Sequence, residues 1–169
     1  MLTNMHKITF YLFFALTLLC LSPSFAQFTI LPGASVHVSD GVTMISQSDV
    51  NNQGTLNVDA SVFTLDASLT NTGTLDLTTA TLKLGTSTSS TKTNTLDISS
   101  GSTPIPVNQL ILDANTSSFE GVSNSSGILR VTESLESKSG TLDAKGKIVL
   151  ANTTATDAAQ VVESSGGAV

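Results

Sequence analysis

Residues 54–58 spell GTLNV, and the phrase returns as GTLDL at 73–77. It recurs as NTLDI at 94–98 and, outside that spacing, as GTLDA at 140–144. Apolar and polar residues alternate within each phrase, as a strand with one buried face requires. We expect Leu75 to face the core and Asp76 to face solvent. Phrases that return at a nearly fixed spacing predict a protein built from stacked repeats.

A second set of apolar positions repeats with nearly the same period. Short apolar stretches end at Ile45, Leu65, Leu84, Leu112, Val131 and Leu150, and only the interval from Leu84 to Leu112 is clearly longer than the others. This long interval predicts an insertion of roughly nine residues between Gly85 and Pro106. The segment includes residues 86–93, which are almost entirely serine and threonine.

The segments between the phrases are rich in turn-forming residues. They include NNQG at 51–54, NTG at 71–73, SSG at 99–101 and 125–127, and KSG at 138–140. We therefore predict an all-β fold, a right-handed parallel β-helix (β-solenoid) of about seven coils with about 19 residues per coil. A β-sandwich also has many short strands, but it explains the fixed spacing less well.

Residues 1–26 have the features of an export signal. Lys7 is basic, residues 8–21 are apolar, and residues 24–26 (SFA) offer small residues at the positions that a signal peptidase inspects. We expect cleavage before Gln27, which leaves residues 27–169 as the β-solenoid repeat domain. A membrane anchor needs roughly 20 apolar residues, and this run is shorter. A lipoprotein would use Cys20, but Leu19 precedes it where a lipobox has Gly or Ala.

The composition limits the functions that this chain can have. Only 12% of its 169 residues are charged and 5% are aromatic, so the core must be thin and filled by small aliphatic residues. Loss of residues 1–26 removes the one cysteine and changes the formal charge from −6 to −7, because Lys7 is lost. A negative chain without a basic stripe is a poor partner for nucleic acid or for anionic lipid. We expect no nucleic-acid partner, and no membrane contact after signal cleavage.

Several stretches resemble the repeats of large secreted or surface-exposed proteins of the Bacteroidetes. They are SGILRV at 126–131, SGTLDAKGKIVL at 139–150 and the opening TILPGASVHV at 29–38. The resemblance implies a β-helix, often placed ahead of other modules and of a C-terminal sorting domain for type IX secretion. This chain stops at Val169 without such a domain, so the resemblance implies the N-terminal part of a longer, truncated protein. Filamentous-haemagglutinin-like and autotransporter passenger repeats fit the same motifs.

The residues predict no catalytic site, no cofactor and no metal site. His37 is the one histidine after residue 26, and a catalytic relay or a zinc site needs further groups converging on it. Polysaccharide lyases and hydrolases need grouped carboxylates, often with nearby cations. The basic residues here are spread along the chain, at Lys83, Lys92, Arg130, Lys138, Lys145 and Lys147. We therefore predict that this protein is not an enzyme.

Three polar residues share one position in the repeated phrase, namely Asn57, Asp76 and Asp97. In register they would form a ladder with a spacing of about 4.8 Å. Adjacent carboxylates at a wet surface repel by around 1 kcal/mol or less, and a bound Ca²⁺ would remove that repulsion. We favour a solvated ladder over a weak calcium site.

These observations predict a secreted or cell-surface structural and adhesive module. The expected partners are glycans or other cell-surface proteins, together with end-to-end association through a C-terminal edge around Val149, Leu150, Val161 and Val162. The alternative is a polysaccharide-binding or polysaccharide-degrading β-helix protein whose active module is missing or unreadable in this sequence. An ice-binding surface would need aligned threonines, and these drift in register at Thr74, Thr78, Thr79, Thr81, Thr93 and Thr95.

Overall fold

The computed structural model describes residues 27–86, 88, 91–98, 104–121, 127–151, 160–163 and 167–168. These residues contain strands and turns but no helix. The strands are β1 (Phe28–Ile30), β2 (Ser35–Val38), β3 (Thr43–Ser46), β4 (Val50–Asn52), β5 (Thr55–Val58), β6 (Val62–Leu65), β7 (Leu69–Asn71), β8 (Thr74–Leu84), β9 (Thr93–Ile98), β10 (Ile105–Gly121), β11 (Leu129–Asp143), β12 (Ile148–Leu150), β13 (Gln160–Glu163) and β14 (Gly167–Ala168). The predicted signal peptide and its cleavage site precede the described residues.

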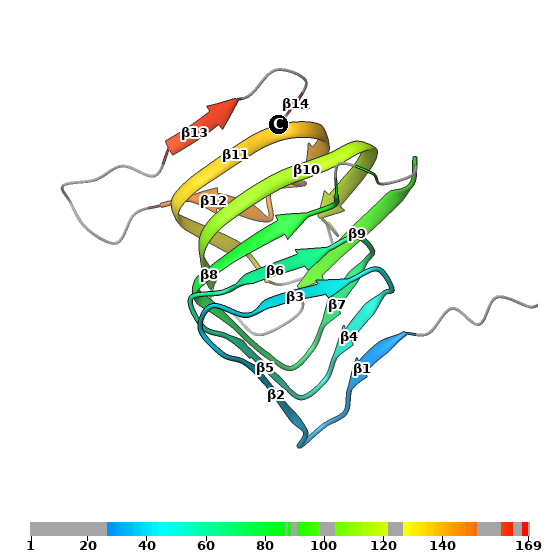
Figure 1. The fold of residues 1–169 in the computed structure, drawn as a ribbon, viewed down its shortest axis with the longest axis vertical. Helices are drawn as coiled ribbons and strands as arrows, with labels where there is room; N and C mark the ends of the chain where they lie inside the picture. Colours follow the sequence, from blue (N-terminus) through cyan, green and yellow to red (C-terminus); the bar gives the residue numbers. More distant parts are fainter. Residues whose placement is uncertain are drawn as a thin grey trace, which may run out of the picture.

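Every strand pairing in the described part of the chain is parallel. Each strand pairs with a strand one coil before or after it, so the coils stack into a solenoid (Figure 1). This arrangement excludes the β-sandwich, whose sheets are antiparallel. The prediction of a parallel solenoid is confirmed.

The stacked coils form three faces. The first face contains β1, β4, β7, β9, the last residues of β10 and β11, and β14. The second contains β2, β5, the first residues of β8, β10 and β11, and β12. The third contains β3, β6, the last residues of β8, the middle residues of β10 and β11, and β13.

The stack corresponds to about five turns, so the predicted count of seven coils is not confirmed. The period that the sequence predicts holds in the first coils, where Val50 pairs with Leu69, and returns between β11 and β12, where Leu129 pairs with Ile148. The coil that follows the first ones is longer, because Leu69 pairs with Leu96 and Leu84 pairs with Leu112. The predicted insertion therefore lies where it was expected, although part of that segment forms β9.

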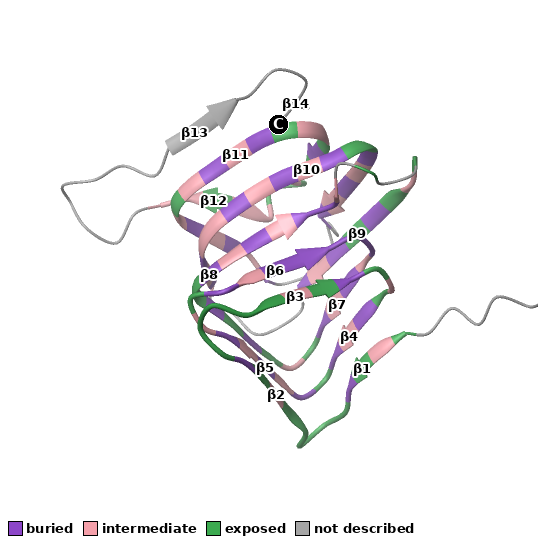
Figure 2. Ribbon diagram, viewed as in Figure 1, coloured by how far each residue is buried: buried purple, intermediate pink, exposed green. Residues whose placement is uncertain are grey.

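The core is a set of aliphatic columns that run along the stack. One column on the third face consists of Met44, Phe63, Leu82, Leu110 and Leu135. Figure 2 shows the alternation of buried and less buried residues along β10 and β11, and the largely exposed surface of β3 in the first coil. Leu75 is buried and Asp76 is exposed, as the phrase predicts.

The corner between the first and second faces explains the glycine of the GTL phrase. Asn52 and Asn71 are fully buried at this corner, and the Nδ2 of Asn52 donates to the Oδ1 of Asn71 at 2.6 Å. Within its own corner, the Oδ1 of Asn52 accepts a bond from Gly54 N. Its Nδ2 also donates to the carbonyl oxygen of Thr74, in the corner of the next coil. A Cβ at Gly73 would overlap the carbonyl oxygen of Gly54. Only glycine therefore allows successive corners to stack this closely.

The second set of repeated positions is correct for part of its length. Leu65, Leu84 and Leu112 form one column, as predicted. The prediction that Ile45 belongs to this column is wrong by one position. Ile45 pairs with Thr64 of β6 and is 60% exposed. The prediction that Val131 follows Leu112 in this column is also wrong, because Leu112 pairs with Ser137. Val131 and Leu150 instead continue the column of Val107 on the second face, since the later corners are longer and shift the count.

Candidate binding site

The predicted ladder of Asn57, Asp76 and Asp97 is only partly formed. Asn57 pairs with Asp76 on the second face, but Asp97 pairs with Thr70 on the first face. The NTLDI phrase moves to another face because the insertion before it changes the phase of the coil. The neighbour of Asn57 on its other side is His37. The ladder prediction is therefore wrong for Asp97, and the two adjacent carboxylates on which the calcium alternative depends are not brought together.

Asp76 itself is used in a local turn. Its Oδ1 accepts bonds from the backbone N–H of Thr78 at 3.0 Å and from the Thr78 hydroxyl at 2.7 Å. His37 lies on the outer side of β2, with its Nε2 3.5 Å from the Oδ2 of Asp59, and both side chains are about half exposed. These contacts are those of surface residues.

Four lysines among the described residues form ion pairs with carboxylates, and two of these pairs lie close together in sequence, at Lys138 with Glu136 and at Lys145 with Asp143. Lys83 and Asp113 form a partly buried pair, at 2.7 Å between Nζ and Oδ2. Burial raises the pKa of Asp113, but the hydrogen bond and charge of Lys83, with help from Ser139 and Lys138, outweigh it and hold the pKa below its ordinary value. The exposed pair of Lys145 and Asp143 lowers the pKa of Asp143 through their hydrogen bond and raises that of Lys145.

The threonines considered for an ice-binding surface lie on different parts of the solenoid. Thr74 is on the second face and Thr81 is on the third. Thr78 and Thr79 lie between these two parts of β8, and Thr93 and Thr95 are on β9 of the first face. They do not form a single flat array.

A hollow lies at the corner between the third and first faces, with a volume of about 440 Å³. Three successive corners line it: residues 47–49 of the first coil, Ala67 of the second, and Lys92 with Asn94 at the start of β9. Gln27, before β1, completes the lining. We name this hollow the corner site.

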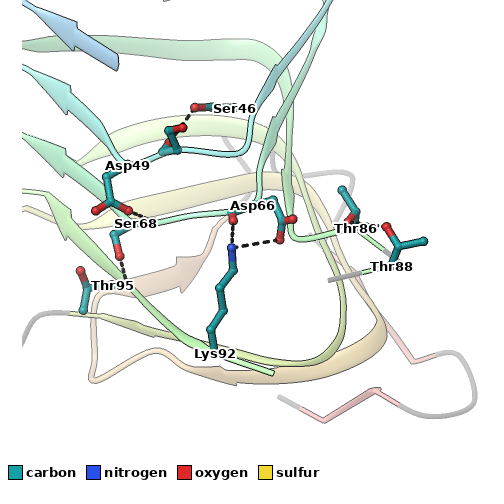
Figure 3. Close-up of polar contacts among 9 residues, drawn as sticks. Ser46, Asp49, Asp66, Ser68, Thr86, Thr88, Lys92 and Thr95 are labelled. Atoms are coloured by element: carbon teal, nitrogen blue, oxygen red, sulfur yellow. Dashed lines mark hydrogen bonds and ion pairs between the residues drawn. The ribbon is translucent and has the colours of Figure 1, made fainter. Parts of the chain in front are cut away.

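Hydrogen bonds between successive corners hold the wall of the corner site (Figure 3). The Oδ1 of Asp49 accepts a bond from the backbone N–H of Ser68 at 3.1 Å, and the Oγ of Ser68 accepts one from the N–H of Thr95 at 3.0 Å. Lys92 extends toward the second corner, where its Nζ donates to the carbonyl oxygen of Asp66 and lies 3.8 Å from the carboxylate Oδ1. The long insertion thus brings a lysine back onto the preceding coil.

Asn94 is the most unusual residue of the corner site. It occupies an inward position of β9 and is only 4% exposed, yet its Nδ2 has no hydrogen-bond partner among the described residues. Most buried polar groups in native proteins are hydrogen-bonded, and this enclosed Nδ2 is an exception among the described residues.

Sequence reasoning missed the corner site. The sequence shows Lys92 only as one of several scattered basic residues, and it aligns Asn94 with Gly54 and Gly73 of the repeated phrase. The available signal was that Asn94 departs from glycine directly after the insertion. Its inward position at a corner could not be known without the register of β9.

Within the described residues, no group of three or more His, Cys, Asp or Glu side chains is placed to hold a metal ion. The described part of the chain also contains no helix long and apolar enough to cross a membrane. No family model, curated protein or solved structure matches the chain.

Proposed function

We propose that this chain is a structural and adhesive β-solenoid module of a secreted or cell-surface protein, with no catalytic site of its own. The observation that supports this proposal is the continuous parallel stack of coils, which places short polar side chains on the outside of a rigid scaffold. Stacked repeats of this kind give extended surfaces suited to binding. The proposal includes a right-handed winding and about seven coils, as the sequence spacing predicts.

The proposed location depends on export. The features of residues 1–26 predict a mature chain that begins at Gln27. Mass spectrometry of protein exported by a bacterial host should give the mass of a chain starting there. A mass that retains residues 1–26, or a lipid on Cys20, would contradict the secreted location.

The proposed partners include further copies of this chain. Within the described residues β1, β2 and β3 each pair with one strand only, as do β12 and β13, so both ends of the stack offer edges for pairing. Exposed strand edges favour association, and an edge-to-edge contact in one direction extends a rod. Light scattering should show mass growing with concentration, and Lys at both Val161 and Val162 should reduce that growth. A sharp monomer at every concentration would contradict this part of the proposal.

Adhesion provides the direct test of the function. The purified exported chain, coated on beads, should retain glycan-bearing bacterial cells better than beads coated with the Leu75→Asp variant, whose fold we expect to be lost. Equal retention by both bead preparations would contradict an adhesive role. Release of reducing sugar ends from polysaccharide by the purified chain would favour the alternative, a polysaccharide-degrading protein.

A further inference from the structure

Gln27 is the first residue of the mature chain that the sequence predicts, and it lies at the N-terminal end of the stack. It is exposed and directly precedes β1. The pairing of β1 begins one residue later, where Phe28 pairs with Val50 and its N–H donates to the carbonyl oxygen of Asp49 at 2.9 Å. The main-chain nitrogen of Gln27 can therefore move without breaking any pairing of the first coil.

The side chain of Gln27 also has space beside it. Gln27 lines the corner site and a second hollow of about 450 Å³, which is formed with Phe28, with residues 44–46 of β3 and with residues 47–48. The side chain therefore has room to fold back toward its own main-chain nitrogen.

Cleavage before Gln27 would place two groups that react with each other on this one residue. The released α-amino nitrogen is a nucleophile, and Cδ of the side chain is an amide carbonyl carbon. When the nitrogen attacks Cδ, the new N–Cδ bond closes a lactam ring and the Cδ–Nε2 bond breaks. Nε2 leaves as ammonia and takes the proton that the α-amino nitrogen loses. Both groups belong to one residue, so the reaction avoids the entropy cost of a bimolecular encounter and consumes no other reactant.

A comparison with Gln47 shows that the position of Gln27 decides its reactivity. Gln47 lines the same two hollows. Its main-chain nitrogen belongs to a peptide bond, where resonance withdraws the lone pair that would attack Cδ. Of these two neighbouring glutamines, only Gln27 gains a free amine when the chain is cleaved.

The lactam would change the charge at an apolar end of the stack. A free α-ammonium group is positive, whereas the lactam is neutral. Beside Gln27, Phe28 and Met44 pack against the core, and Ile45 is 60% exposed. A charged group that enters a contact at this end loses its water at a cost in free energy. The neutral ring therefore suits the end-to-end contact proposed above better than a free amine does.

We propose that Gln27 of the exported chain is converted to pyroglutamate by attack of its α-amino nitrogen on its own Cδ, with release of ammonia. This inference rests on the export and cleavage that belong to the proposed function. It assigns a covalent modification to the new N-terminus and a neutral group to the end of the stack.

Intact-mass spectrometry of the exported chain, incubated in neutral buffer until its mass is constant, tests the proposal. The main species should be lighter than a chain of residues 27–169 by one ammonia molecule, and its N-terminal sequencing should be blocked. Pyroglutamyl aminopeptidase should remove residue 27, so that sequencing then reads from Phe28. The matched control Gln27→Asn keeps a side-chain amide, but it is one methylene shorter and cannot close this ring. It should keep its full mass and give a readable first residue.

Each result separates the modification from the export on which it rests. An exported chain that starts at Gln27 with its full mass overturns the modification and leaves the export standing. A chain that retains residues 1–26 overturns both. Loss of ammonia from Gln27→Asn as well would overturn the assignment to Gln27. Light scattering should show the cyclised chain associating at lower concentration than Gln27→Asn, and equal association would overturn the effect of the ring on end-to-end contact.

Discussion

The first two coils and the coils that follow them turn their corners in different ways. In the first coils, strands of three or four residues such as β4 and β5 are separated by sharp turns. In the later coils, β10 and β11 run for 17 and 15 residues and bend through the corners as continuous strands (Figure 1). The pairing of β10 with β11 shifts register at those bends, between Leu112 and Asp113 and between Asp113 and Ser118.

The difference lies in the residues at the corners. Asn52 and Asn71 bond across the first coils, whereas the residue that pairs with Asn71 in the next coil is Ile98. At a later corner the chain turns at Asn115 and Gly140, both with positive φ. The strand phrases are similar in both regions, so the corners set the length of the repeat. This comparison leads to four predictions.

The largest effect is expected in the core of the first coils. Leu75→Asp places a charge among buried aliphatic residues and should reduce the free energy of unfolding by about 4 kcal/mol. Asp76→Leu alters an exposed side chain whose bonds within the described residues go to Thr78, so it should cost about 1 kcal/mol or less. Urea unfolding followed by circular dichroism measures both. Equal losses would mean that the inward and outward positions of β8 are wrongly assigned.

The second prediction concerns the glycines at the corners. Gly73→Ala forces a Cβ onto the carbonyl of Gly54 and should cost about 3 kcal/mol. At Gly146, in a later turn, an added Cβ would meet open space. Gly146→Ala should therefore reduce the free energy of unfolding only through its positive φ, by about 1 kcal/mol. The same unfolding measurement compares the two. If Gly146→Ala were the more damaging change, close stacking would not distinguish the first corners.

The third prediction compares two buried asparagines. Asn52→Ala removes three hydrogen bonds at the first corners and should cost about 2 kcal/mol. Asn94→Leu removes an amide whose Nδ2 has no partner among the described residues, so it should change stability by no more than about 0.5 kcal/mol. Asn51→Ala, on the outer side of β4, is the control. A large loss in Asn94→Leu would indicate that Asn94 has a structural role.

The smallest effect is expected where the two regions meet, at the ion pair of Lys83 in β8 and Asp113 in β10. Lys83→Met should cost about 1 kcal/mol at neutral pH. The pKa of Asp113 is lowered in the folded state, so this contribution is complete above the ordinary value of 3.8 and is lost as the pH falls below it. Thermal unfolding should therefore show the two proteins converging in acid. A difference that stays constant down to the lowest pH would contradict the assigned pair.

The sequence was sufficient for the strand phase and the parallel stack, because alternation and period are local properties. Leu75, Asp76 and the column of Leu65, Leu84 and Leu112 are where the pattern placed them. Asp97 and Val131 were misplaced because a period does not say which face a phrase occupies once a corner has lengthened. The corner site was not predictable either. It needs Asp49, Ala67 and Lys92 to meet, and their contact depends on how three corners of unequal length stack.

The parallel pairing of neighbouring coils has a consequence for how the chain folds. Phe28 pairs with Val50, Val50 with Leu69 and Leu77 with Val107, so each strand finds its partner within one coil of sequence. The entropy lost in closing loops of this length differs little from one coil to the next. Within the described part of the chain, no strand pairs with a segment that is distant in the sequence. We expect folding to begin at one coil and to proceed along the chain as further residues emerge during synthesis or transport, each finished coil serving as the template for the next.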